Sequence, residues 1–173
     1  PRFVISNEVA VTTTKTYQIE YSTGACTVWT AVPRRIDIST QHWKMDPSPY
    51  VEDGMTTSHS AGLTVPGGNT FVPGRIQTVN RTTPPITLLP SQYTEIEYAI
   101  RSTGNISFDS QYCFRLSNAG EVSDFVYTQV PHITPLSKVF RYNAGGGGGG
   151  FRFIEEVPSV VATTTVTGGA ASS

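Results

Sequence analysis

Three histidines, His42, His59 and His132, are the side chains of this sequence best suited to bind a transition metal or to move a proton near neutral pH. No two of them lie two or four residues apart, the spacings that place side chains on one face of a strand or a helix. The sequence also contains no HExxH motif and no CxxC pair. It therefore predicts no transition-metal site and no cofactor.

The acidic segment between Met45 and Met55 is the second candidate for metal chemistry. Its carboxylates, Asp46, Glu52 and Asp53, could bind Ca²⁺ together with backbone carbonyls, because Ca²⁺ prefers oxygen ligands. Their spacing does not match an EF-hand loop. We favour the interpretation that this segment is a solvated acidic loop.

Residues for covalent or phosphate chemistry lack the context that an enzyme requires. There is no GxSxG motif for a nucleophile elbow. The glycine run Gly145–Gly150 is followed by Phe-Arg-Phe, where a phosphate-binding loop needs Lys and Ser or Thr. Asp37, Glu95 and Glu97 could in principle be glycosidase carboxylates, but Glu95 and Glu97 fit better on the solvent-exposed face of a strand. We predict that the chain is not an enzyme.

The two cysteines, Cys26 and Cys113, are interpreted as a disulfide, the alternative being two unrelated buried thiols. The bond would close a loop of about 87 residues and stabilise the fold by roughly 4–5 kcal/mol in the chain-entropy model. Such a bond indicates an oxidising compartment. Two sequons make Asn80 and Asn105 acceptors of N-glycosylation in a host that carries out this modification.

The composition favours an extracellular or cell-surface protein. Charged residues make up 14% of the chain and the formal net charge is −1, which predicts no binding to nucleic acid. Abundant Thr and Tyr with few charges are typical of secreted β proteins. No apolar run approaches the ~18 residues of a transmembrane helix, so we expect no membrane insertion. The start at Pro1 indicates a processed mature chain or an excised fragment.

Alternating apolar and polar residues predict an all-β fold. The clearest strand-like segments are Thr16–Ser22, Tyr93–Arg101, Gln111–Ser117 and Phe125–Thr134. The residues expected to face inward are Tyr17, Ile19 and Tyr21, then Ile96, Tyr98 and Ile100, then Tyr112, Phe114 and Leu116. Gly and Pro mark turns between short strands, and no segment has the period of an amphipathic helix. Many short strands of this kind predict a β-sandwich.

Part of this pattern resembles a known domain family. The segment YCFRLSNAGEVS resembles the penultimate strand of immunoglobulin-like fibronectin type III domains, with Tyr112, Phe114 and Leu116 followed by Asn118 and Gly120 in a turn. The resemblance covers residues 88–130 and implies a β-sandwich.

The cysteine departs from the immunoglobulin pattern, in which the tyrosine lies two residues before the Cys. Here Tyr112 and Cys113 are adjacent, so they face opposite sides of a strand. A disulfide to Cys26 would therefore hold a loop or an edge segment and would not bridge two sheets.

Residues 17–134 are also similar to repeated sandwich domains of large secreted surface proteins of uncultured bacteria. The matching residues are Ile19-Glu20-Tyr21, Gly24-Ala25-Cys26, Thr40-Gln41-His42-Trp43 and the YCFRLSNAG hairpin. This similarity implies a role in cell-surface scaffolding.

The organisation that we expect is an N-terminal strand segment (1–15), a β-sandwich domain (16–136) and a C-terminal extension (137–173). The extension has a glycine tether, and about ten flexible residues span roughly 16–19 Å. The tether consists of Gly145, Gly146, Gly147, Gly148, Gly149 and Gly150. It is followed by an uncharged, β-branched segment, and such a strand must pair to avoid aggregation. The segment consists of Val160, Val161, Ala162, Thr163, Thr164, Thr165, Val166 and Thr167.

We interpret this segment as an end strand that pairs either with its own domain or with a neighbouring subunit. Lent to the next copy, it would join subunits head to tail into a filament or surface assembly, as in donor-strand complementation. The alternative is an adhesin or carbohydrate-binding module excised from a larger repeat protein, which would bind cell-surface glycans. Its aromatic platforms would be Trp29, Trp43, Tyr50 and Phe71, although Trp43 could instead fill the core and Trp29 cover it.

Overall fold

The computed structural model describes residues 1–37, 39–59, 63–64, 66–122, 125–127, 130–137 and the backbone of 164–168. This part of the chain is all-β, as predicted, and contains no helix that could span a membrane. The strands are β1 (Arg2–Asn7), β2 (Thr13–Lys15), β3 (Tyr17–Thr23), β4 (Thr30–Ala31), β5 (Trp43–Met45), β6 (Thr70–Val72), β7 (Ile76–Gln77), β8 (Ile86–Leu88), β9 (Gln92–Tyr98), β10 (Ile100–Ser102), β11 (Tyr112–Asn118), β12 (Val126–Tyr127), β13 (His132–Ile133) and β14 (Thr164–Gly168).

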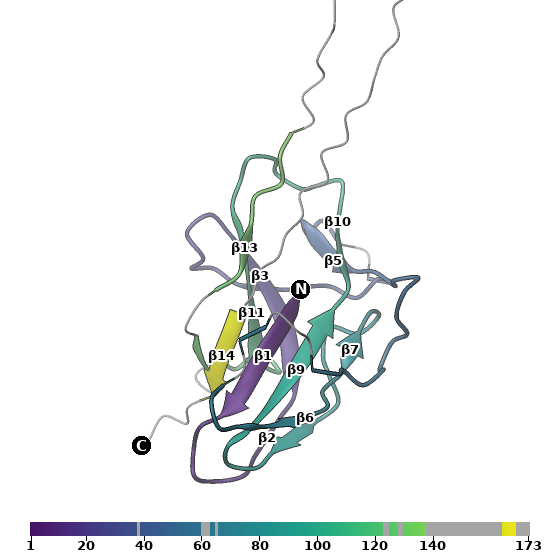
Figure 1. Cartoon of the computed structure of the whole chain (residues 1–173). Helices are drawn as coiled ribbons and strands as arrows, with labels where there is room; N and C mark the ends of the chain where they lie inside the picture. Colours follow the sequence, from purple (N-terminus) through teal and green to yellow (C-terminus); the bar gives the residue numbers. More distant parts are fainter. Residues whose placement is uncertain are drawn as a thin grey trace, which may run out of the picture.

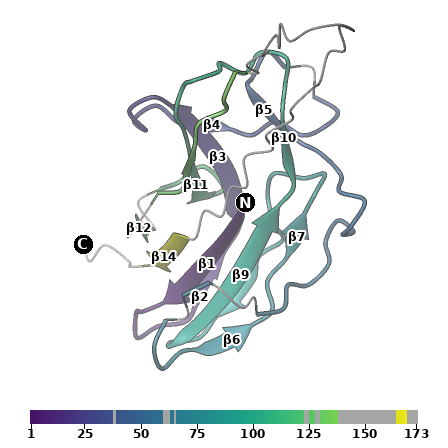
Figure 2. The same cartoon turned by 45° about the horizontal axis from the view of Figure 1, so that its top comes forward.

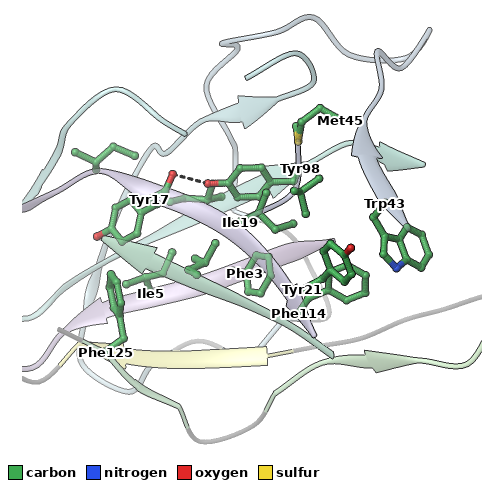
Figure 3. Close-up of a cluster of buried hydrophobic side chains, with 14 of the residues drawn as sticks. Phe3, Ile5, Tyr17, Ile19, Tyr21, Trp43, Met45, Tyr98, Phe114 and Phe125 are labelled. Atoms are coloured by element: carbon green, nitrogen blue, oxygen red, sulfur yellow. Dashed lines mark hydrogen bonds between the residues drawn. The ribbon is translucent and has the colours of Figure 1, made fainter. Parts of the chain in front are cut away.

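The strands form two main sheets and two short ribbons, an arrangement consistent with a β-sandwich (Figures 1 and 2). The larger sheet has the order β12-β14-β1-β9-β6, and β7 also pairs with β9. The smaller sheet has the order β13-β11-β3-β4. The ribbons are β10-β5 and β2-β8. The core lies between β1 and β9 on one side and β3 and β11 on the other (Figure 3).

The predicted inward faces of β3 and β11 are confirmed. Tyr17, Ile19 and Tyr21 are buried, and so are their neighbours on β11, Phe114 and Leu116. The two strands pair antiparallel along their whole length, with Ile19 opposite Leu116 and Tyr21 opposite Phe114. Because paired residues lie on the same side of a sheet, the two alternating patterns combine into one apolar surface.

Aromatic side chains fill much of this core. The Tyr98 hydroxyl donates a hydrogen bond of 2.8 Å to the Tyr17 carbonyl, so its polar end is satisfied in an apolar setting (Figure 3). Burial raises the pKa of Tyr98 and keeps the phenol neutral. Trp43 is also a core residue, which was one of the two alternatives that the sequence left open. Its ring packs edge-on against Tyr112 and Phe114. It is therefore not a surface platform for sugars.

Two sequence expectations about strands need correction. The single strand expected from Tyr93 to Arg101 divides at Ala99, whose carbonyl accepts a hydrogen bond from the Asp46 amide. After this point β10 leaves the larger sheet and pairs with β5, and Ile100 is only partly buried. The segment expected as one strand from Phe125 to Thr134 instead contributes β12 to the larger sheet and β13 to the smaller one.

Cys26 and Cys113 form a disulfide, as predicted, with their Cα atoms 5.7 Å apart. Cys113 lies on β11 on the face opposite Tyr112, and Cys26 lies in the loop after β3. The bond therefore holds a loop against the smaller sheet and does not connect the two sheets, as the adjacency of Tyr112 and Cys113 implied.

The predicted hairpin turn after β11 is also present. Asn118 and Glu121 exchange two backbone hydrogen bonds of 2.7 and 3.0 Å, which leaves Ala119 and Gly120 as the central residues. Both have positive φ, 51° for Ala119 and 108° for Gly120. Tight hairpins of this kind favour Asn-Gly, because an alanine in the left-handed region costs about 1 kcal/mol or more.

Ala119→Asn is therefore expected to stabilise the protein by about 0.5–1 kcal/mol, because asparagine tolerates the left-handed conformation. Urea unfolding followed by fluorescence would measure the change. The control is Ala10→Asn, at an exposed alanine that does not have positive φ. Equal effects of the two substitutions would contradict the assignment of strain to Ala119.

Candidate functional site

The strand β1 has a partner on both of its edges. On one edge it pairs antiparallel with β9, from Arg2 opposite Glu97 to Asn7 opposite Gln92. On the other edge it pairs in parallel with β14, from Phe3 beside Thr164 to Asn7 beside Gly168 (Figure 1). The side chains of β1 from Phe3 to Asn7 are all buried. The first strand of this chain thus lies in the interior of the larger sheet.

The strand β14 lies between β1 and β12. Its second edge pairs antiparallel with β12, where Val126 faces Thr167 and Tyr127 faces Val166. Residues 164–168 are distant in sequence from both neighbours. Without them, β1 and β12 would each present unpaired backbone groups, and an open edge of this kind is a template for another strand. We call the space between β1 and β12 that β14 occupies the β14 slot.

Part of the terminal segment that the sequence analysis expected to pair as a strand does so in the structure. Thr164 to Thr167 belong to β14, whereas Val160 to Thr163 and the glycine tether Gly145–Gly150 lie outside the described residues. The strands that pair with β14, β1 and β12, were not singled out from the sequence. The inward-facing Phe3 and Ile5, two residues apart, were the available signal for β1.

The outer face of β9 differs from the expectation. Glu95, expected on a solvent-exposed face, is completely buried, and only Glu97 keeps partial exposure. The Arg2 guanidinium lies 2.8 Å from Glu95 Oε2 and 3.2 Å from Glu97 Oε2. His59 Nδ1 lies 2.8 Å from the other Glu95 oxygen. Neighbouring segments therefore cover Glu95, with Arg2 as its ion-pair partner and His59 as a hydrogen-bond partner.

Gly74 allows the segment that covers Glu95 to approach β9 closely. A side-chain carbon at Gly74 would lie only 2.1 Å from the Glu95 carbonyl oxygen, so only glycine fits. The Thr57 hydroxyl accepts a hydrogen bond from the Gly74 amide and donates one to the Glu95 carbonyl, at 2.8 and 2.7 Å. These contacts hold the segment that carries His59 over the middle of the strand.

A second buried carboxylate lies on the outer face of the smaller sheet. Glu20 Oε2 accepts a 2.8 Å hydrogen bond from Arg115 Nε, and Glu20 Oε1 accepts one of 2.9 Å from the Ser117 hydroxyl. The Arg115 guanidinium lies 4.3 Å from the centre of the Trp29 ring, which is partly exposed. This cluster links β3, β11 and the residue before β4. It places Trp29 over Arg115 and not over the core cluster, which one of the sequence interpretations expected it to cover.

The other sequence candidates do not form a common site. Asp46 pairs with Arg101 at 3.5 Å, whereas Asp53 accepts hydrogen bonds from the backbone amides of residues 78 and 79. Among the described residues, no group of three or more His, Cys, Asp or Glu side chains could hold a metal ion. Asn80 and Asn105 are both exposed, so each sequon is accessible. Tyr50 is 90% exposed, and Phe71 packs against Tyr93.

Similarity to known proteins does not assign this chain to a family. Comparisons with protein-family models, with curated proteins and with solved structures give no match. The likeness of residues 88–130 to fibronectin type III domains therefore stays a prediction from the sequence.

Proposed function

We propose that this chain is a non-enzymatic structural subunit of an extracellular filament or surface assembly, in which copies join by exchange of a terminal strand. The observation that carries the proposal is the insertion of β14 between β1 and β12. A strand from the far end of the chain completes the larger sheet, and it does so through backbone pairing that any copy of the same strand could supply.

The sequence around β14 supports this role. Residues 164–167 are threonine and valine, which suit a strand and carry no charge. The six glycines from Gly145 to Gly150 lie between the sandwich and this strand, and we assign them as the tether. A strand that leaves its own subunit and enters the next one makes a head-to-tail contact, and such a contact gives a filament when it does not close into a ring.

The location that we propose is the cell exterior. The disulfide between Cys26 and Cys113 is compatible with an oxidising compartment. The resemblance to fibronectin type III domains and to repeats of secreted bacterial surface proteins points in the same direction. Binding of cell-surface glycans, as an adhesin or carbohydrate-binding module, is the alternative function, and the partly exposed Trp29 ring is the feature that favours it.

Removal of the terminal strand tests the proposal. The full chain is expected to form long, regular filaments, and a chain that ends after Asn143 is expected to stay monomeric because it lacks β14. Light scattering and electron microscopy of the same samples would measure the difference. A second variant keeps the full length: Val166→Pro removes one backbone donor from β14 and is also expected to lose the filament.

Two results would contradict the proposed function. One is a truncated chain that still polymerises. The other is a full chain that remains a particle near 18.7 kDa at every concentration tested.

A further inference from the structure

The β14 slot has defined walls and a defined direction. One wall is β1, which runs parallel to β14, and the other is β12, which runs antiparallel to it. The register fixes five positions along β1, from Phe3 beside Thr164 to Asn7 beside Gly168. The slot therefore specifies the orientation of its occupant and the position of each residue along it.

We propose that this slot is the acceptor site for residues 164–168 of a second copy of the chain, and that the chain's own β14 occupies it beforehand as a cap. The inference rests on the proposed function, and it adds which strands accept the donor, in which direction and in which register. The described structure is then the capped state of the subunit. In the assembled state, the same strand of a neighbour pairs with β1 in the same parallel register.

The backbone hydrogen bonds in the slot explain why the chain's own β14 can act as a cap. A strand from the same chain and a strand from a neighbour make identical backbone hydrogen bonds in the slot, as in domain swapping. Which of the two strands occupies the slot depends on the effective concentration of the chain's own strand compared with the concentration of other copies. The glycine tether that we propose would hold the chain's own strand at an effective concentration on the order of millimolar. Dilute chains are thus expected to remain capped, and assembly requires crowding or release of β14.

Cysteine pairs placed at register partners test both occupancies in the full chain. Ser6 lies beside Thr167, and neighbouring strands are about 4.8 Å apart, a separation that a disulfide can span. The chain with both Ser6→Cys and Thr167→Cys is expected to give an intrachain bond at low concentration. A mixture of the Ser6→Cys chain and the Thr167→Cys chain, concentrated and then oxidised, is expected to give a covalent dimer on a non-reducing gel.

The matched control combines Ser6→Cys with Thr164→Cys, which lies beside Phe3 and so about 10 Å along the strand from the position of Ser6. No bond is expected for this pair in either experiment. If a cysteine at Ser6 prevents folding, Val4→Cys with Thr165→Cys offers a second pair of register partners. The native disulfide between Cys26 and Cys113 stays in all variants.

The outcomes separate the inference from the proposed function. Filaments that form without a bond between the two single-cysteine chains would overturn the acceptor site and leave the structural role intact. An intrachain bond at every concentration, with no filaments, would overturn both, since β14 would then be a permanent strand of its own sheet. A bond in the mismatched control would overturn the register.

Discussion

Loss of the disulfide is expected to lower the free energy of unfolding by roughly 4–5 kcal/mol, the largest single effect that we predict. Cys26 and Cys113 are separated by 87 residues, and the bond removes the corresponding chain entropy from the unfolded state. The change to test is the double substitution Cys26→Ala with Cys113→Ala. Urea unfolding of both proteins would give the free energies.

Reductant provides the control for this experiment. It should lower the unfolding midpoint of the natural chain and leave that of the double variant unchanged. The urea dependence should also steepen when the bond is absent, because the unfolded chain then exposes more surface. Coincident midpoints of the natural chain with and without reductant would contradict a stabilising bond.

Glu95→Ala is expected to cost about 3–5 kcal/mol, the second large effect. Glu95 is completely buried and binds Arg2 and His59 through its two oxygens. Its removal leaves the Arg2 side chain, which is only 23% exposed, without its nearest carboxylate. Thermal and urea unfolding would measure the loss.

Glu97→Ala is the matched control, because Glu97 lies on the same strand and contacts the same arginine. Its side chain is 34% exposed, and the weaker pair is expected to contribute less than about 1 kcal/mol. The assignment of Glu95 as a structural ion-pair centre fails if the two substitutions cost the same. Glu95→Gln, which keeps the shape, would separate the loss of charge from the cavity.

The faces of β3 and β11 could be predicted from the sequence because alternation along one strand is a local property. One face of β3 carries Tyr17, Ile19 and Tyr21, so only one orientation of the strand buries its apolar side chains. The same reasoning failed for Glu95. Its burial depends on Arg2, Thr57 and His59, which come from other parts of the chain, and no periodicity within β9 contains that information.

The candidate site, too, could be predicted from the sequence only in part. That residues 164–167 would pair as a strand could be predicted from their composition, and they are four of the eight residues, 160–167, for which this was expected. The partner could not be predicted, since strands pair through backbone groups that are alike in every sequence. The two residues of β12 are too few to give a pattern.

The position of β1 has a consequence for how the molecule acquires its structure during synthesis. Residues 2–7 are made before both of their neighbours, β9 at residues 92–98 and β14 at 164–168. Pairings over such separations have a high contact order, and β proteins of this kind fold in milliseconds to seconds. One edge of β1 therefore stays unpaired until residues 164–168 have been translated. Each growing chain therefore passes through a period in which that edge of β1 has no strand of its own chain to pair with, and under the proposed function this is when a strand of another chain could bind first.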